Sequence, residues 1–394
     1  MSHSTTDALP EAIARWIESE TGGRVVAARR AGAGASRRAW AVDVAAGGAS
    51  PLALFCLVDA EGSEGGSMRD AAVLRALAPT PVPVPRVFGA CATRSAVLLE
   101  RVAGRSDFPA VDREAEREPT ARDLMRLAAA LHRLDPTALA IEHLGRADAD
   151  AEPARTQQVE LAALLERLGP DALAVQRFAA AWLARRPPAA RSTSLVHSDL
   201  GPGNFLYAGG RVNAILDWEV AHWGDPMEDL AAIAVRDMAT PIGPLARRFA
   251  EYAEAGGAPI DLAAVGWYRV FILARNTALI ALRLRGGVEP GARVALERFQ
   301  LLLLRALALC LCDVVGAERP EPAGRADTGG GESGVGAQAS GAVPADGAQA
   351  SGTVAADDVA RARALAADYH ARARAAGEDF APFLDRLPQR LVIP

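Results

Sequence analysis

The stretch "LVHSDLGPGNFLYAGGRVNAILDWE", residues 195–219, places a histidine, two aspartates, an asparagine and a glutamate close together in the chain. Two runs of β-forming residues separated by glycines predict a strand, a tight loop and a hairpin. A Gly-Pro turn alone would explain Asp199 and Asn204, because Asp and Asn side chains commonly bond to the backbone of turns. It gives no reason for the other three polar residues. Whether the stretch is a turn or a site therefore depends on the rest of the chain.

The composition favours a globular protein with more than one lobe. A chain of 394 residues, half of them hydrophobic, is long for a single core. The net charge of −5 and the absence of a basic stripe argue against a nucleic-acid partner, since phosphate binding needs clustered positive charge. The sequence contains no lysine, so all 43 basic residues are arginine. Any cationic contact to phosphate must therefore come from arginine.

Nothing in the sequence favours export or a membrane. The N-terminus lacks the basic and apolar regions of a signal peptide. Residues 299–315 are the only membrane candidate, but they are short and interrupted by Arg305, so no span is expected. The four cysteines match no disulfide or metal spacing and are predicted to be free thiols: Cys56, Cys91, Cys310 and Cys312. These features predict a cytoplasmic, enzyme-like protein.

Hydrophobic periodicity, together with breaks rich in Gly and Pro, divides the chain into five segments. Residues 1–23 contain an amphipathic helix, and residues 24–102 alternate strands with a glycine loop and one helix. Residues 103–315 are mostly helical. Residues 316–353 have no aromatic side chain and predict a disordered linker. Residues 354–394 hold one further helix and a tail.

The spacing His-x-Asp-x-x-x-x-Asn, followed by a hairpin that ends in Asp, is the layout of kinase-like phosphotransferases. It is formed by His197, Asp199, Asn204 and Asp217. Phosphoryl transfer needs one carboxylate at the acceptor hydroxyl. An amide oxygen and a second carboxylate hold magnesium against the nucleotide phosphates. The full set of residue types therefore favours a catalytic site over a turn.

Several motifs in order resemble the aminoglycoside phosphotransferase and choline kinase-like family, over roughly residues 10–290. They include Asp-Trp-Glu at 217–219 in place of Asp-Phe-Gly, Gly-Asp-Pro at 224–226, "AALHRLDP" at 129–136 and "PVPVPRV" at 81–87. The sequence is most similar to the branch whose relatives also occur fused to acyl-CoA dehydrogenases. The resemblance implies an α+β, protein-kinase-like two-lobe fold, with a small β-rich N-lobe for the nucleotide and a larger helical C-lobe.

The resemblance also implies an activity and its catalytic residues. The chain would transfer the γ-phosphoryl group of ATP to a hydroxyl of a small molecule. Asp199 would be the base, His197 would orient its loop, and Asn204 and Asp217 would bind Mg²⁺.

Nucleotide binding is assigned by the same resemblance. The loop containing Gly32, Gly34 and Ser36 would cover the phosphates with backbone N–H groups, a use of glycine loops that has its own physical basis. The strand end from Glu100 to Val102 would present backbone groups to adenine.

The acceptor is left open by the sequence. Members of the family phosphorylate aminoglycosides, macrolides, amino alcohols and hydroxyacyl compounds. Similarity to the dehydrogenase-fused branch favours a hydroxyacyl or related metabolite over an antibiotic, by analogy. Arg269, Arg275 and Asn276 lie on an otherwise apolar helix, and we expect them to face solvent rather than line the acceptor pocket.

Other polar residues near the motif have structural explanations. Asp225 is predicted to cap a helix, and Asp229 and His132 to belong to a buried network. Glu219 is predicted either to support the metal site or to be a surface charge. Ser198 occupies a position that is usually glycine in the family.

The third strand departs from the family pattern. Kinase-like folds place a Lys or Arg there to hold the α- and β-phosphates, paired with a carboxylate on the next helix. The equivalent residue here is Leu57, and Asp70 on that helix is explained as part of a capping box with Ser67. Two hypotheses follow. Either an arginine reaches the phosphates from elsewhere (Arg37, Arg38 or Arg69), or the chain is a non-catalytic nucleotide-binding pseudokinase.

Overall fold

The computed structural model describes residues 8–31, 37–47, 50–60, 65–109, 113–145, 147, 152–189, 193–286, 288 and 290–316. The predicted glycine loop with Gly32, Gly34 and Ser36 lies outside the described residues, as do 317–394, which hold nearly all of the predicted linker and the C-terminal helix. The described residues fall into two compact units. One lies within Met1–Ala163 and Trp182–Ile272, and the other within Leu164–Ala181 and Leu273–Asp385.

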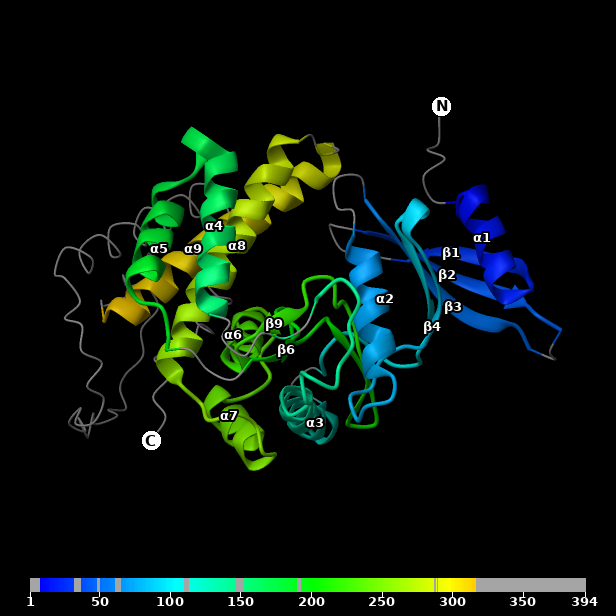
Figure 1. Cartoon of the computed structure of the whole chain (residues 1–394), viewed down its shortest axis with the longest axis horizontal. Coiled ribbons are helices and arrows are strands. Elements are labelled where there is room, and N and C mark those ends of the chain that lie inside the picture. Colours follow the sequence, from blue (N-terminus) through cyan, green and yellow to red (C-terminus); the bar gives the residue numbers. More distant parts are fainter. Residues whose placement is uncertain are drawn as a thin grey trace, which may run out of the picture. The chain divides into compact units, whose positions relative to one another are not determined.

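The first unit contains a five-stranded antiparallel sheet (Figure 1). Its strands lie in the order β1 (Arg24–Ala31), β2 (Arg37–Ala45), β3 (Leu52–Asp59), β5 (Ala96–Glu100) and β4 (Val87–Cys91). Four of them were predicted as strands, and the segment of β4 was predicted only to be extended. The sheet, followed along the chain by helices, confirms the predicted α+β class.

The two faces of this sheet have different partners, because successive side chains of a strand point to opposite sides. On one face, Trp40, Leu54 and Cys56 pack against Trp16 and Ile17 of α1 (Glu11–Thr21), the dark-blue helix beside the sheet in Figure 1. On the other face, residues of β2, β3 and β5 line a cavity: Ala39, Phe55, Leu57 and Leu99. The sheet therefore has a closed hydrophobic face and a face open to a ligand.

Helix α2 (Gly66–Leu77) begins differently from the sequence prediction. Its N-terminal N–H groups are satisfied by Asp59 at the end of β3, which accepts from Gly65 at 3.1 Å and from Ser67 at 3.0 Å. The Ser67 hydroxyl also donates to Asp59, at 2.5 Å. The prediction of a capping box formed by Ser67 and Asp70 was therefore wrong. A carboxylate from another element took its place, which left the Asp70 side chain available for other contacts.

A short hairpin positions the metal-binding candidates. Strands β7 (Phe205–Ala208) and β8 (Arg211–Ile215) are joined by Gly209 and Gly210, with φ of 57° and 76°. Two consecutive left-handed residues are what a two-residue hairpin turn needs, and glycine adopts them without strain. Because Phe205 pairs with Ile215, the residues on either side of the hairpin, Asn204 and Leu216, lie next to each other.

The first unit also contains α3 (Glu114–His132), the paired strands β6 (Ser194–Val196) and β9 (His222–Gly224), α6 (Pro226–Asp237) and α7 (Leu245–Glu254). Helix α3 contacts both β8 and α7. Helices α4 (Pro153–Leu168), α5 (Ala174–Arg185) and α8 (Leu262–Arg285) each contribute residues to both units, and α9 (Pro290–Val315) belongs to the second.

The second unit has its own small core, in which Leu164, Leu168, Ala172 and Ala278 pack together. Within the described part of the chain, no helix combines the length and the apolar character needed to cross a membrane, α9 included. All four cysteines are free thiols, as predicted.

Asp237 at the end of α6 makes folding sensitive to pH. Its carboxyl is buried, and its Oδ1 accepts a hydrogen bond from the Ile242 N–H at 2.7 Å. Burial raises the pKa of Asp237 to about 6, although this hydrogen bond and nearby arginines act in the opposite direction. The unfolded carboxyl titrates near pH 4, so between about pH 4 and 6 the folded chain binds more protons than the unfolded chain. The free energy of unfolding should therefore fall as pH rises through that interval.

Asp237→Asn keeps the acceptor oxygen and cannot ionise, so it should remove this fall. Wild type should lose about 1–3 kcal/mol of stability between pH 4 and 7 through this group, and the variant should not. Denaturant unfolding at a series of pH values measures the difference. Glu142→Gln, at an exposed carboxylate, is the matched control. An unchanged slope in Asp237→Asn would contradict the assignment.

Candidate active site

The loop between β6 and β7 carries the His-x-Asp motif, and His197 lies behind it. His197 is fully buried, and its Nε2 lies 2.8 Å from the carbonyl oxygen of Leu216. Its Nδ1 accepts the N–H of Asp199 at 3.2 Å, which fits the tautomer protonated at Nε2. His197 thus joins the catalytic loop to the end of the hairpin. This is consistent with the orienting role predicted for it.

The carboxylate of Asp199 is held by two side chains. Arg236 on α6 donates from Nε to Oδ1 at 2.8 Å and from Nη2 to Oδ2 at 2.5 Å. Asn204 donates from Nδ2 to Oδ2 at 2.9 Å, and also to the Asp199 carbonyl. A two-pronged arginine contact fixes both the position and the plane of a carboxylate. Arg236 was not predicted from the sequence.

The glycines of the loop make room for Arg236. A Cβ on Gly201 would lie 2.8 Å from Cδ of Arg236, and one on Gly203 would lie 3.2 Å from its Nη1. Both glycines also have positive φ. The sequence signal for Arg236 was therefore indirect. Two glycines beside the motif aspartate indicate that another chain segment passes close to it.

Asp229 anchors the same loop from the opposite end of α6. Its carboxylate accepts the N–H of His197 at 3.0 Å and the N–H of Ser198 at 2.7 Å. The imidazole of His132 lies 2.9 Å from it through Nε2 and contacts the hydroxyl of Tyr252 through Nδ1 at 2.8 Å. All of these side chains are buried. The prediction that Asp229 and His132 form a structural network is confirmed.

Ser198 has φ of 66°, in the left-handed region that favours glycine, which explains why glycine is usual there. Its hydroxyl donates to Oε1 of Glu228 at 2.6 Å, an interaction that glycine cannot make and that helps to offset the strain. Asp225 caps α6 by accepting the Met227 N–H at 2.9 Å, as predicted.

The Asp-Trp-Glu segment is bound to α2 through its backbone. Asp217 is in a left-handed conformation, with φ of 68°. The next N–H, that of Trp218, donates to Oδ1 of Asp70 at 2.6 Å. Burial raises the pKa of Asp217, and its neighbours Asp70 and Asp199 add to this effect, whereas Arg37 opposes it. Asp217 is thus held at the hairpin end with a carboxylate that favours a nearby cation.

Arg37 of β2 lies among four carboxylates. Its Nη1 contacts Asp70 and lies 3.7 Å from Asp217, its Nη2 is 2.9 Å from Oε2 of Glu219, and its Nε is 3.7 Å from Asp59. Burial lowers the pKa of Arg37, but the carboxylates of Asp70, Glu219 and Asp217 outweigh it, so the net pKa is raised. Burial in turn raises the pKa of Asp70, and Arg37 opposes that shift. Glu219 therefore has an ionic partner and is not a free surface charge.

A cavity of about 520 Å³ adjoins these groups. Leu57 and Leu99 line its apolar side, Glu100 and Val102 its edge, and Asn204 and Asp217 its polar end. Its size is in the range of small-molecule sites.

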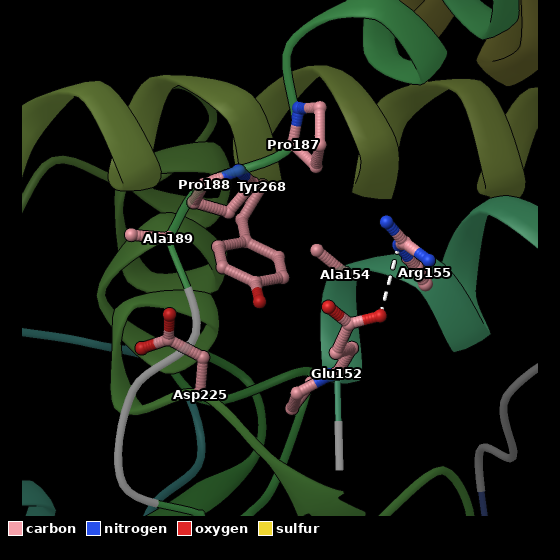
Figure 2. A pocket seen from close by; sticks show the side chains of 9 residues that line it. Glu152, Ala154, Arg155, Pro187, Pro188, Ala189, Asp225 and Tyr268 are labelled. Carbon is pink, nitrogen blue, oxygen red and sulfur yellow. Dashed lines mark ion pairs between the residues drawn. The ribbon is translucent and has the colours of Figure 1, made fainter. Parts of the chain in front are cut away.

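A second cavity, of about 70 Å³, lies at the start of α6 (Figure 2). The Tyr268 hydroxyl points into it, between Asp225 and Glu152, and Glu152 forms an ion pair with Arg155 at 2.9 Å. This space accommodates only a few water molecules. The larger cavity is therefore the candidate active site.

Two arginines on α8 differ from their prediction. Arg269 and Arg275 are 4% and 6% exposed, so the expectation that they face solvent was wrong. Neither is among the residues that line the two cavities. The local pattern marked them only as charges on an apolar helix, which does not distinguish a surface position from a buried ion pair.

Three solved structures that share the fold carry names of phosphotransferases. A protein of Ralstonia eutropha JMP134 assigned to the aminoglycoside phosphotransferases is 22% identical with a TM-score of 0.57, covering 76% of this chain and 95% of that one. Macrolide 2'-phosphotransferase type I is 18% identical with a TM-score of 0.54, covering 74% and 97%. Aminoglycoside phosphotransferase APH(4)-Ia, solved with ADP and hygromycin B, is 17% identical with a TM-score of 0.52, covering 75% and 98%. At these identities the likeness establishes the fold alone.

A search of curated proteins found no sequence match. The family model of the phosphotransferase enzyme family, in contrast, matches residues 27–268, which is more than half of the chain and includes every described residue of the candidate site. The chain therefore belongs to the phosphotransferase enzyme family, and it has the two-lobe, protein-kinase-like fold.

Proposed function

We propose that the protein transfers the γ-phosphoryl group of Mg-ATP to a hydroxyl of a small molecule, with Asp199 as the base. The observation that carries this proposal is that Asn204 and Asp217 line the 520 Å³ cavity, while the same Asn204 side chain donates to the carboxylate of Asp199 at 2.9 Å. A protein that only binds a nucleotide has no need of a carboxylate fixed by an arginine beside the metal ligands. This geometry favours the enzyme over the pseudokinase.

The apolar part of the cavity suits a purine base. Leu57 and Leu99 form its wall, and the chain from Glu100 to Val102 forms its edge. A backbone N–H of this edge, such as that of Val102, would donate to a ring nitrogen and fix the position of the base. The ADP complex of APH(4)-Ia supports an adenine nucleotide as the occupant.

The polar end suits a magnesium ion. Because Nδ2 of Asn204 donates to Asp199, its Oδ1 is the atom left to face the cavity. With Asp217 it offers one amide and one carboxylate oxygen, hard ligands of the type that Mg²⁺ prefers. The two side chains would hold the ion, and phosphates and water would complete its shell. The ion would neutralise the negative charge of the phosphates.

In the reaction, the acceptor oxygen attacks the γ-phosphorus in line with the leaving oxygen. The new bond joins that oxygen to phosphorus, the bond between the γ-phosphorus and the β–γ bridging oxygen breaks, and ADP leaves. Asp199 accepts the hydroxyl proton. Arg236 and Asn204 keep its carboxylate in one orientation, and His197 fixes the loop that carries it.

The acceptor class is tested by a panel. The named relatives act on aminoglycosides and macrolides, whereas the motifs of this sequence favour a hydroxyacyl compound. ADP formation should be measured with Mg-ATP and one representative each of aminoglycosides, macrolides, amino alcohols and hydroxyacyl compounds. We expect acceptor-dependent ADP release with the hydroxyacyl compound. If the chain binds no nucleotide at millimolar Mg-ATP, the proposed function is wrong.

Asp199→Asn should abolish transfer to the acceptor found in that panel and leave Mg-ATP affinity within about twofold of wild type. The base acts on the acceptor proton in the transition state, so its loss lowers turnover rather than nucleotide binding. Steady-state kinetics and calorimetry measure the two quantities. Asp107→Asn, at an exposed aspartate, controls for the substitution itself. Turnover close to that of wild type would show that Asp199 is not the base.

Asp217→Ala should lose the magnesium dependence of nucleotide binding, because it removes the charged ligand that joins the ion to the phosphates. Calorimetric titration with ATP, in the presence of Mg²⁺ and of EDTA, measures this dependence. Wild type should bind ATP at least about tenfold more tightly with magnesium, a difference of about 1.4 kcal/mol, and the variant should show no difference. A magnesium effect of wild-type size in Asp217→Ala would rule out this ligand.

A further inference from the structure

The active site lacks a cation where related folds supply one. Leu57 on β3 lines the cavity, and β3 carries no basic residue. The polyphosphate of ATP carries several negative charges, and the magnesium ligands Asn204 and Asp217 contribute no positive charge. Because the chain has no lysine, we expect arginine to supply the cationic side chain that contacts the phosphates.

Arg37 enters the same space from the neighbouring strand. In the register of β2 and β3, Ala39 pairs with Leu57 and Arg37 pairs with Asp59. Because side chains alternate along a strand, all four lie on one face of the sheet, the face that lines the cavity. Arg37 is therefore displaced from Leu57 by one strand across the sheet and two residue pairs along it. Both residues line the same cavity.

The Arg37 guanidinium has carboxylates around it but keeps two donor groups without a hydrogen-bond acceptor among the described residues. Arg37 is only 6% exposed, yet its Nε and Nη2 make no hydrogen bond with the part of the protein that the structure describes. Nη2 lies close to Glu219, but not in hydrogen-bonding geometry. Buried donors without acceptors are costly, and most native structures avoid them. Arg37 lies on the wall of a nucleotide-sized cavity, next to the proposed magnesium ligand Asp217. Its unpaired donors are suited to phosphate oxygens.

We propose that Arg37 is the cation that binds the nucleotide phosphates, in place of the basic residue missing from the third strand. This rests on the proposed function, since it assumes that Mg-ATP occupies the 520 Å³ cavity. Asp70 on α2 takes the role of the paired carboxylate and holds Nη1 of Arg37. Its other oxygen accepts the Trp218 N–H, so the carboxylate that positions Arg37 also positions the segment that carries Asp217.

The two other candidate arginines have different contacts. Arg38 is exposed on the opposite face of β2, with its guanidinium 5.8 Å from the centre of the Trp40 ring. Arg69 donates to the carbonyl oxygen of Glu219 at 3.0 Å. Neither lines the cavity. Of the three arginines named from the sequence, the geometry selects Arg37.

The test separates phosphate binding from a purely structural ion pair. Removing Arg37 alone leaves Asp70 buried without its partner, which destabilises the fold. The informative variant is therefore Arg37→Met/Asp70→Asn, compared with Asp70→Asn, in which the amide oxygen can still accept the Trp218 N–H. Arg38→Met is the control on the same strand. Affinities for Mg-ATP, Mg-ADP and adenosine are measured by calorimetry for each folded protein.

We expect the double variant to bind Mg-ATP and Mg-ADP about tenfold to hundredfold more weakly than Asp70→Asn, with adenosine affinity unchanged. Adding Leu57→Arg to the double variant should recover part of the loss, because it returns a cation to the same wall. Arg38→Met should behave as wild type. Unchanged Mg-ATP affinity in the double variant, or an equal loss for adenosine, would overturn the role of Arg37. Failure of wild type to bind Mg-ATP would instead overturn the proposed function.

Discussion

The contact between Arg37 and Asp70 is the interaction on which the site depends. It joins β2 to α2, and through the Trp218 N–H it also fixes the Asp-Trp-Glu segment. Taking an arginine and a carboxylate out of water is costly, and a buried pair is retained only where geometry and further hydrogen bonds compensate. Here the pair is surrounded by Asp59, Asp217 and Glu219, so negative charge exceeds positive charge around one guanidinium. Such an excess suits a site that receives a divalent cation together with its anionic ligand.

The catalytic loop is fixed in a different way, by contacts from both ends of a single helix, α6. Asp229, near the start of α6, accepts two consecutive backbone N–H groups of the loop, and Arg236, near its end, binds the Asp199 carboxylate. A carboxylate held by both a planar arginine fork and an amide has little freedom to rotate. Preorganisation of this kind reduces the reorganisation needed when the acceptor arrives. The left-handed conformations of Ser198 and Asp217 show that the loop and the hairpin end are held against local backbone preference.

The sequence predicted the parts of this arrangement that are encoded locally. The strands, the Gly209–Gly210 hairpin and the approach of Asn204 to Asp217 follow from alternation, turn chemistry and spacing. Asp70 was misjudged because a local rule, the capping box, competed with a tertiary contact to Arg37, and the tertiary contact prevailed. Arg236 was missed because its contact with Asp199 spans 37 positions and depends on how α6 packs. The burial of Arg269 and Arg275 was misjudged for the same reason, since helix packing decides which face of a helix is covered. The roles of Asp199, Asn204 and Asp217 remain predictions that the geometry favours.

The central claim is that Arg37, Asn204 and Asp217 together hold Mg-ATP in the cavity beside Asp199. It is tested most directly by a crystal structure of the wild-type protein with magnesium and a non-hydrolysable ATP analogue. We predict the metal between the Asn204 amide oxygen and the Asp217 carboxylate, the base against Leu57 and Leu99, and Arg37 within hydrogen-bond distance of phosphate oxygens. An Arg37 that keeps only its carboxylate partners, with the phosphates bound by other residues, would contradict the claim.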